Sequence, residues 1–266
     1  MPRLARPLAA ASLLLLVTAA CGEGKPEASP EPRGRPTPAA YSLPDRCTGQ
    51  GAGGEVVFLP GEDGSVVSAA SFGDGDHAAV FVHQTGITGL CGWVPYAAWA
   101  ARHGIRAVVV DACGFGRSQC TDELDADPAA QLALPVSWAR EQGATSVTLV
   151  GASMGGSLVA GAGDAAGADA LVDVSGPADW EGVPPIEDAV PAASVPLLLM
   201  FARGDSPADW RRARAATRGT VATFVDVPGA GHGYSIVTDG SLVDARITKQ
   251  GRRVLRWVRG GYAAAR

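Results

Sequence analysis

The chain has 266 residues, of which 47% are hydrophobic and 18% are charged, so it can bury one large core and needs no second domain. Its formal net charge is −5, and it has no dense run of basic residues, which argues against recognition of nucleic-acid phosphates. The C-terminal arginines Arg252, Arg253, Arg256 and Arg259 are typical of the solvated face of a helix.

The first 21 residues have the pattern of an export signal. Arg3 and Arg6 give it a basic start, and the apolar run Leu8–Ala20 is too short to span a bilayer. The run leads into Cys21 and resembles the lipobox of bacterial lipoproteins, although Thr18 stands where that motif usually has Leu. The resemblance implies that Cys21 becomes the lipidated first residue of the mature protein. We therefore expect an exported protein, anchored by lipid to the outer face of the bacterial cell membrane, with free secretion as the alternative.

Residues 22–46 are rich in Pro, Glu, Gly, Ser and Ala and nearly lack large apolar side chains. Such a segment cannot bury enough surface to offset the entropy lost when it is ordered, so we expect a flexible tether. The folded domain is expected to cover residues 47–266.

After residue 55, short apolar runs alternate with longer segments of helical pattern. The first two runs predict a β-hairpin, and the later continuous runs predict strands buried on both faces. This order predicts an α/β fold with a doubly wound, mostly parallel sheet of eight strands, with helices on both faces and ligands at the carboxyl ends of the strands. The expected strands are Glu55–Leu59, Val66–Ser71, Ala78–His83, Arg106–Val110, Ser146–Val150, Ala170–Val174, Pro196–Phe201 and Val221–Val227. The expected helices are Trp93–His103, Pro128–Gln142 with a kink or break at Pro135, Met154–Gly163, Pro207–Thr217 and Ala245–Arg259.

Four cysteines follow the export signal: Cys47, Cys91, Cys113 and Cys120. An even number of cysteines in an oxidising compartment favours disulfides, and their spacing does not match a zinc site. Three pairings are possible. We favour Cys113 with Cys120, which closes a short loop, and Cys47 with Cys91, which ties the start of the domain to the start of its first helix.

The segment Gly151–Gly156 reads Gly-Ala-Ser-Met-Gly-Gly and lies between a predicted strand and a predicted helix. This arrangement is typical of a nucleophile elbow, in which a serine sits on a strained turn and flanking glycines avoid collisions with the neighbouring strand or helix. Ser153 is therefore the candidate nucleophile. The N–H of Met154, at the start of the helix, is a candidate donor to a developing oxyanion.

A serine hydroxyl needs a base to take its proton and an acid to orient that base. Of the four histidines, only His232 follows the elbow, in a glycine-rich loop directly after the last predicted strand. Asp205, just past the end of the preceding strand, is the candidate acid, and Asp179 is the second candidate. His83 ends a predicted strand, and we expect it to be structural.

These residues resemble the α/β-hydrolase superfamily, and the resemblance extends from Glu55 to Arg259. Three motifs carry it: Gly151–Gly156, the loop Asp111–Ser118 with the spacing Asp-x-x-Gly-x-Gly-x-Ser, and the Gly-His-Gly loop at His232. The resemblance implies that Asp111 is structural.

The resemblance also implies a second oxyanion donor directly after His83. Members usually have His-Gly followed by the donor residue, but Gln84 replaces the glycine in this chain. This departure leaves Gln84 and Thr85 as candidates, of which we favour Thr85.

The function implied is that of an exported, esterase-like serine hydrolase that cleaves small acyl esters or amides through a Ser-His-Asp triad and an acyl-enzyme, without a metal or cofactor. A different reaction on the same triad, that of a peptidase or a cofactor-free haloperoxidase, is one alternative, and a non-enzymatic binding lipoprotein is another. The oligomeric state stays open.

The segment Ser175–Val195, where this fold often carries a lid, is short and contains several prolines and glycines. It therefore predicts a minimal lid, with Trp180 and Val183 as candidates to cover part of the pocket, and a preference for short acyl groups.

Overall fold

The computed structural model describes residues 41–241 and 243–263. The export signal, its Cys21 and the greater part of the expected tether lie outside the described residues. Within the described ranges, no helix combines the length and the apolar character needed to cross a membrane.

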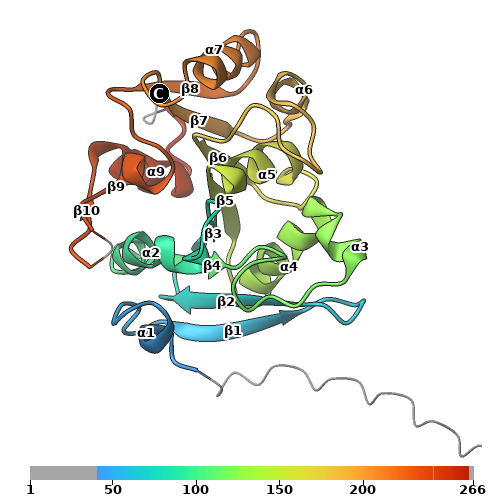
Figure 1. The fold of residues 1–266 in the computed structure, drawn as a ribbon, viewed down its shortest axis with the longest axis vertical. Coiled ribbons are helices and arrows are strands. Elements are labelled where there is room, and N and C mark those ends of the chain that lie inside the picture. Colours follow the sequence, from blue (N-terminus) through green and yellow to red (C-terminus); the bar gives the residue numbers. More distant parts are fainter. Residues whose placement is uncertain (1–40, 242, 264–266) are drawn as a thin grey trace, which may run out of the picture. The chain divides into compact units, whose positions relative to one another are not determined.

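An eight-stranded sheet forms the centre of the domain (Figure 1). The strand order is β1-β2-β4-β3-β5-β6-β7-β8, in which β2 runs antiparallel to β1 and β4 and all other neighbours are parallel. The predicted hairpin and the predicted parallel sheet are both confirmed. The strands are β1 (Glu55–Pro60), β2 (Val66–Phe72), β3 (His77–Val82), β4 (Ile105–Val110), β5 (Ser146–Ala152), β6 (Ala170–Val174), β7 (Leu197–Ala202) and β8 (Thr223–Val227).

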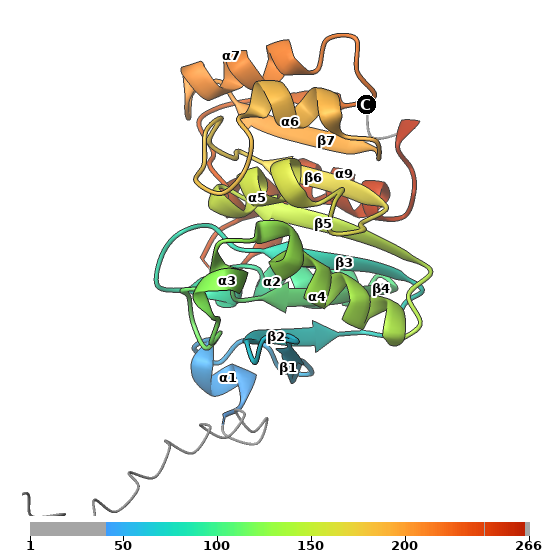
Figure 2. The same ribbon diagram turned by 90° about the vertical axis from the view of Figure 1, so that its right-hand side faces the viewer.

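Helices cover both faces of this sheet (Figures 1 and 2), with α2 and α9 on one face and α4, α5 and α6 on the other. Successive residues of β3 alternate between the two faces, so Phe81 joins the core under α2 and α9 and Val80 joins the core under α4 and α5. The helices are α1 (Leu43–Arg46), α2 (Val94–Ala101), α3 (Asp122–Asp125), α4 (Pro128–Glu141), α5 (Met154–Ala162), α6 (Ile186–Ala192), α7 (Pro207–Ala216), α8 (Tyr234–Val237) and α9 (Lys249–Val258).

One helix is not broken at its internal proline, and another begins later than expected. α4 continues through Pro135 without a break, because its buried face, which includes Leu132 and Val136, packs against the sheet and outweighs one lost backbone hydrogen bond. α9 begins later than expected, at Lys249, since the residues before it form strand β10 (Arg246–Ile247), which pairs with β9 (Thr238–Asp239). Thr248 then caps the helix by accepting a hydrogen bond from the N–H of Gly251.

The ordered domain starts before the expected boundary at residue 47. Leu43, in α1, is only 1% exposed and belongs to the core. Arg46 pairs with the fully buried Asp111 at 2.6 Å. Residues 43–46, which composition assigned to the tether, are therefore part of the folded unit. Their composition gave no sign of this, because the partners that order them lie far along the chain.

The structure contains two disulfides, Cys47–Cys91 and Cys113–Cys120, which are the two pairings favoured from the sequence. The first joins the end of α1 to the 3-10 turn η2 (Gly89–Gly92), which precedes α2. The second closes the loop after β4.

We expect the Cys47–Cys91 disulfide to stabilise the domain more than Cys113–Cys120, because it closes the longer loop. The bonded cysteines are 44 residues apart in the first pair and 7 in the second. On chain-entropy grounds these separations correspond to about 4 and about 2.5 kcal/mol. Urea unfolding of two double Cys→Ser variants, one for each disulfide, measures the two losses in the free energy of unfolding. A larger loss for the short-loop variant would contradict the loop-length argument.

Candidate active site

Ser153 occupies the turn between β5 and α5, with φ 51° and ψ −122°. A positive φ is strained for a residue with a side chain, and it is typical of a nucleophile elbow. A Cβ at Gly151 would lie 1.9 Å from the carbonyl oxygen of Gly155, and one at Gly155 would lie 2.4 Å from that of Val82. Only glycine fits at these two positions, so the turn presses the start of α5 against β3 and β5.

Asp205 and His232 come together although they are 27 residues apart in the chain. Asp205 follows β7 and His232 follows β8, and these strands are parallel neighbours. Nδ1 of His232 lies 2.6 Å from Oδ2 of Asp205. The loop is braced by Ser235, whose Oγ accepts from the N–H of His232 and donates to its carbonyl oxygen. Because Nδ1 faces the carboxylate, Nε2 is the ring nitrogen left for another partner.

The His232 loop lies close to the residue before the nucleophile. A Cβ at Gly233 would lie 3.6 Å from the Cβ of Ala152, and one at Gly204 would lie 3.1 Å from the Cβ of Ala230. The loops that carry Ser153, Asp205 and His232 thus meet at the carboxyl ends of their strands, as expected for a parallel sheet. In the described part of the chain, the hydroxyl of Ser153 shares no hydrogen bond with His232. Such bonds are often long before substrate binds.

The two candidates for the second oxyanion donor differ in their surroundings. The N–H of Gln84 donates to the hydroxyl of Tyr234 at 3.1 Å, and Gln84 Oε1 accepts from the N–H of Tyr234 at 3.3 Å. Thr85 has no acceptor for its N–H among the described residues. Met154 opens α5, so its N–H has no acceptor within that helix. The N–H groups of Met154 and Thr85 therefore remain available to a ligand.

Asp179, the second candidate acid, lies elsewhere. It pairs with Arg212, which also binds Glu187, and it does not contact His232.

The two residues expected to be structural are both fully buried. The ring of His83 shares a hydrogen bond with the carbonyl oxygen of Gln84 and accepts one from the N–H of Ala112. Burial lowers the pKa of His83 and favours its neutral form. Asp111 accepts hydrogen bonds from Arg46 and from the backbone of Leu90 and Arg117.

A buried carboxyl group under the elbow was missed from the sequence. Asp173, in β6, is 1% exposed; its Oδ1 accepts from the N–H of Gly176 at 2.7 Å, and its Oδ2 has no partner among the described residues. It packs so closely under α5 that a Cβ at Gly156 would lie 2.2 Å from Oδ1. Burial, aided by the charge of Asp209, raises the pKa of Asp173 to about 7. One aspartate within an otherwise apolar strand was the available signal.

We expect Asp173 to make the domain less stable as the pH rises from about 4 to about 7. Over this range the folded carboxyl keeps its proton while the unfolded one, with a pKa near 3.8, loses it. The folded state then binds more protons, so the free energy of unfolding falls with pH, by roughly 4 kcal/mol at most. Above pH 7 the effect is constant.

The Asp173→Asn variant isolates this effect, because the amide can still accept from Gly176 but does not titrate. Urea unfolding gives the free energy of unfolding of both proteins. The difference, variant minus wild type, should rise by roughly 4 kcal/mol between pH 4 and pH 8. An unchanged difference between the two proteins across this range would show that Asp173 titrates normally.

A cavity of about 700 Å³ begins at Met154, the residue after the nucleophile. Trp180 and Gly182 form part of its wall, so the segment after β6 does cover one side of the pocket. Val183 instead packs against α5: a Cβ placed on Gly161 would lie 2.6 Å from the Cβ of Val183. The cavity is lined by Ala112, Cys113, Phe115, Asp122, Asp125, Ala126, Pro128, Gln131, Met154, Leu158, Trp180, Glu181 and Gly182.

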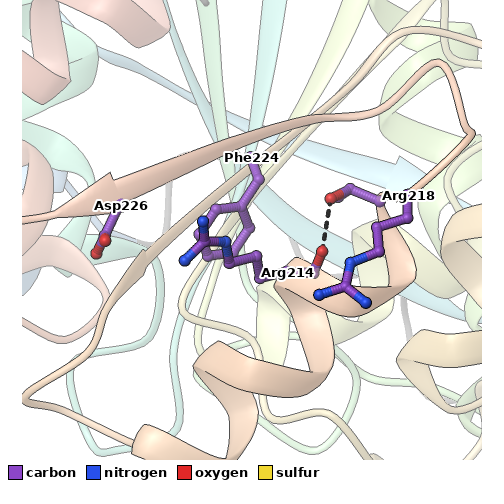
Figure 3. Close-up of a pocket in the computed structure, with 5 residues that line it drawn as sticks. Arg214, Arg218, Phe224 and Asp226 are labelled. Carbon is purple, nitrogen blue, oxygen red and sulfur yellow. Dashed lines mark hydrogen bonds between the residues drawn. The ribbon is translucent and has the colours of Figure 1, made fainter.

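A second cavity, of about 430 Å³, lies between the end of α7 and β8 (Figure 3). Two of its charged side chains have partners: the guanidinium of Arg214 lies 5.0 Å from the ring centre of Trp210, and Asp226 accepts from Trp210 and lies 3.8 Å from Arg203. None of the lining residues belongs to the loops of Ser153, Asp205 or His232, so this cavity is separate from the candidate active site.

No protein-family model and no curated protein matches the sequence. Solved structures do match. A proline iminopeptidase from Mycobacterium smegmatis aligns with a TM-score of 0.60 and 12% identity, covering 80% of this chain and 100% of that chain. An esterase from Thermogutta terrifontis aligns with a TM-score of 0.57 and 18% identity, covering 79% of this chain and 99% of that chain. An esterase from Pyrococcus furiosus aligns with a TM-score of 0.53 and 14% identity, covering 74% of this chain and 88% of that chain. Likeness at these identities shows a shared architecture, and the domain described here has the α/β-hydrolase fold.

Proposed function

We propose that this protein is a serine hydrolase that cleaves small acyl esters or amides, with Ser153 as nucleophile, His232 as general base and Asp205 as the acid that orients it. The observation that carries the proposal is the 2.6 Å contact between Nδ1 of His232 and Asp205, in a loop that lies close to the residue before Ser153. Ser153 itself has the backbone conformation of a nucleophile elbow. A structural serine would not need that strain.

In the proposed reaction, Nε2 of His232 takes the proton of the Ser153 hydroxyl as the oxygen attacks the substrate carbonyl. Asp205 holds the tautomer that leaves Nε2 free and stabilises the imidazolium. The imidazolium then gives its proton to the leaving alcohol or amine, and an acyl group remains on Ser153. Water, activated by His232 in the same way, attacks this acyl-enzyme, so that the acid is released and the serine is restored.

The oxyanion of each tetrahedral intermediate would be bound by the N–H groups of Met154 and Thr85. Gln84 is the weaker candidate because Tyr234 already occupies its N–H. In this role Gln84 fixes the oxyanion segment to the His232 loop. The proposed chemistry uses only side chains and backbone groups of the protein, with no metal or cofactor.

The similar structures include esterases and a proline iminopeptidase, and this supports both the esterase proposal and peptide cleavage as the second candidate. We also propose that the protein is exported and anchored through a lipidated Cys21. Two disulfides in the folded domain fit an oxidising compartment outside the cytoplasm.

We expect kcat/KM for nitrophenyl esters to peak at short acyl groups. The cavity beside Met154 has acidic residues on its wall, and the segment after β6 covers it only through Trp180, Glu181 and Gly182. The carboxylates on this wall would interrupt the burial of a long acyl chain, so each added methylene should gain less than the roughly 0.8 kcal/mol of full burial.

Initial rates over a series from acetate to palmitate test this expectation. The Ser153→Ala variant serves as the control for background hydrolysis. A maximum at long chains, or a jump in rate above the solubility limit of the ester, would show that an apolar tunnel or a mobile lid exists.

A further inference from the structure

The cavity that begins at Met154 has an uneven distribution of charge. Its ionisable lining residues are Asp122, Asp125 and Glu181, and no Lys, Arg or His lines it. In the described part of the chain, these three carboxylates take part in no ion pair. They form what we call the acidic rim. Arg212 is outside the lining and pairs with Asp179 and Glu187.

A hydrogen-bond donor on a mostly buried side chain also lines this cavity. Gln131, in α4, is only 8% exposed, and its Oε1 accepts from the N–H of Cys113 at 2.9 Å. Its amide nitrogen has no partner among the described residues, although Gln131 lines the cavity. Because this nitrogen is open to the cavity, it can donate to water or, in its place, to a ligand acceptor such as a carbonyl or ester oxygen.

The acidic rim is not arranged as a metal site. Among residues 41–241 and 243–263, no group of three or more His, Cys, Asp or Glu side chains is close enough to hold a metal ion. The three carboxylates give the cavity wall a negative charge. Two aromatic side chains, Phe115 and Trp180, line the same cavity. Aromatic faces next to carboxylates suit an organic cation, because the ring faces attract ammonium groups.

We infer that this cavity selects substrates that carry an amine or quaternary ammonium group. The cationic group binds between the acidic rim and the aromatic side chains, while Gln131 donates to an oxygen of the same substrate. This inference rests on the proposed function for the position of the scissile bond next to Ser153. It goes beyond that function by naming the charge of the substrate.

Two acetate esters of equal shape test the inference: acetylcholine, and 3,3-dimethylbutyl acetate, in which carbon replaces the charged nitrogen. We expect kcat/KM to be about tenfold higher for the cationic ester at low ionic strength, an effect within reach of three exposed carboxylates. The preference should fall to about twofold near 0.5 M salt, because the screening length becomes short.

A triple variant, Asp122→Asn with Asp125→Asn and Glu181→Gln, should reduce the ratio between the two esters to within about twofold. The matched control removes the same number of charges away from the cavity, by Glu55→Gln, Asp74→Asn and Asp76→Asn. The control should keep the ratio of the wild type. Equal kcat/KM for the two esters in the wild type, or a preference that survives in the rim variant, would overturn the inference.

Binding measurements separate this inference from the proposed function. If neither ester is hydrolysed, the proposed function fails, and titration calorimetry with choline and 3,3-dimethylbutanol then decides the inference. Tighter binding of choline by the wild type, lost in the rim variant, would support a cation site. Equal binding of the two alcohols would refute it.

Discussion

Ser153→Ala and His232→Ala should each lower kcat/KM on an activated ester by about 10³-fold or more, while the free energy of unfolding stays within about 1 kcal/mol of the wild type. Ser153 supplies the attacking oxygen, and His232 is the only described histidine whose ring meets a carboxylate at the elbow. The two losses should not add in the double variant, because the hydroxyl and its base act as one unit.

Controls for these variants come from the opposite end of the sheet. Ser194 is exposed and precedes β7, and His103 is exposed and precedes β4. Ser194→Ala and His103→Ala should keep the activity of the wild type. If His232→Ala retained near-normal turnover, another group would have to be the base.

Asp205→Asn should reduce kcat/KM by roughly 10² to 10⁴-fold. The amide can still pack beside His232, but its NH₂ group would favour the wrong tautomer of the ring, with the proton on Nε2. It also removes the charge that stabilises the imidazolium. Measurement on a neutral activated ester, with unfolding followed in parallel, separates loss of function from loss of fold.

Asp179→Asn is the matched control, because it removes one carboxylate from the segment after β6 and breaks an exposed ion pair with Arg212. This variant should stay active. An active Asp205→Asn variant together with an inactive Asp179→Asn variant would transfer the orienting role to Asp179.

The elbow could be predicted because its constraints are local. A side chain at Gly151 would collide with Gly155, and one at Gly155 would collide with the neighbouring strand β3. The spacing of these glycines around Ser153 therefore indicates the elbow. The meeting of Asp205 and His232 followed from the rule that loops after parallel strands share one edge of the sheet. It was enough to know that Asp205 and His232 each directly follow a predicted strand.

Other features could not be predicted, because they depend on partners distant in the sequence. The ion pair between Arg46 and Asp111 spans 65 residues, and it places the start of the domain within a segment of tether-like composition. The acidic rim gathers Asp122 and Asp125 from α3 and Glu181 from the segment after β6, and nothing in either stretch alone indicates a common cavity.

The most direct test of the account is labelling of the full chain with a fluorophosphonate probe, which reacts covalently with activated serines. We expect one label per folded protein, located on Ser153 by mass analysis of the digest. Labelling should be absent in Ser153→Ala, strongly slowed in His232→Ala and Asp205→Asn, and lost when the wild type is unfolded in urea. A folded wild type that takes up no label, or a Ser153→Ala variant that is labelled at the rate of the wild type, would contradict the assignment of Ser153 as an activated nucleophile.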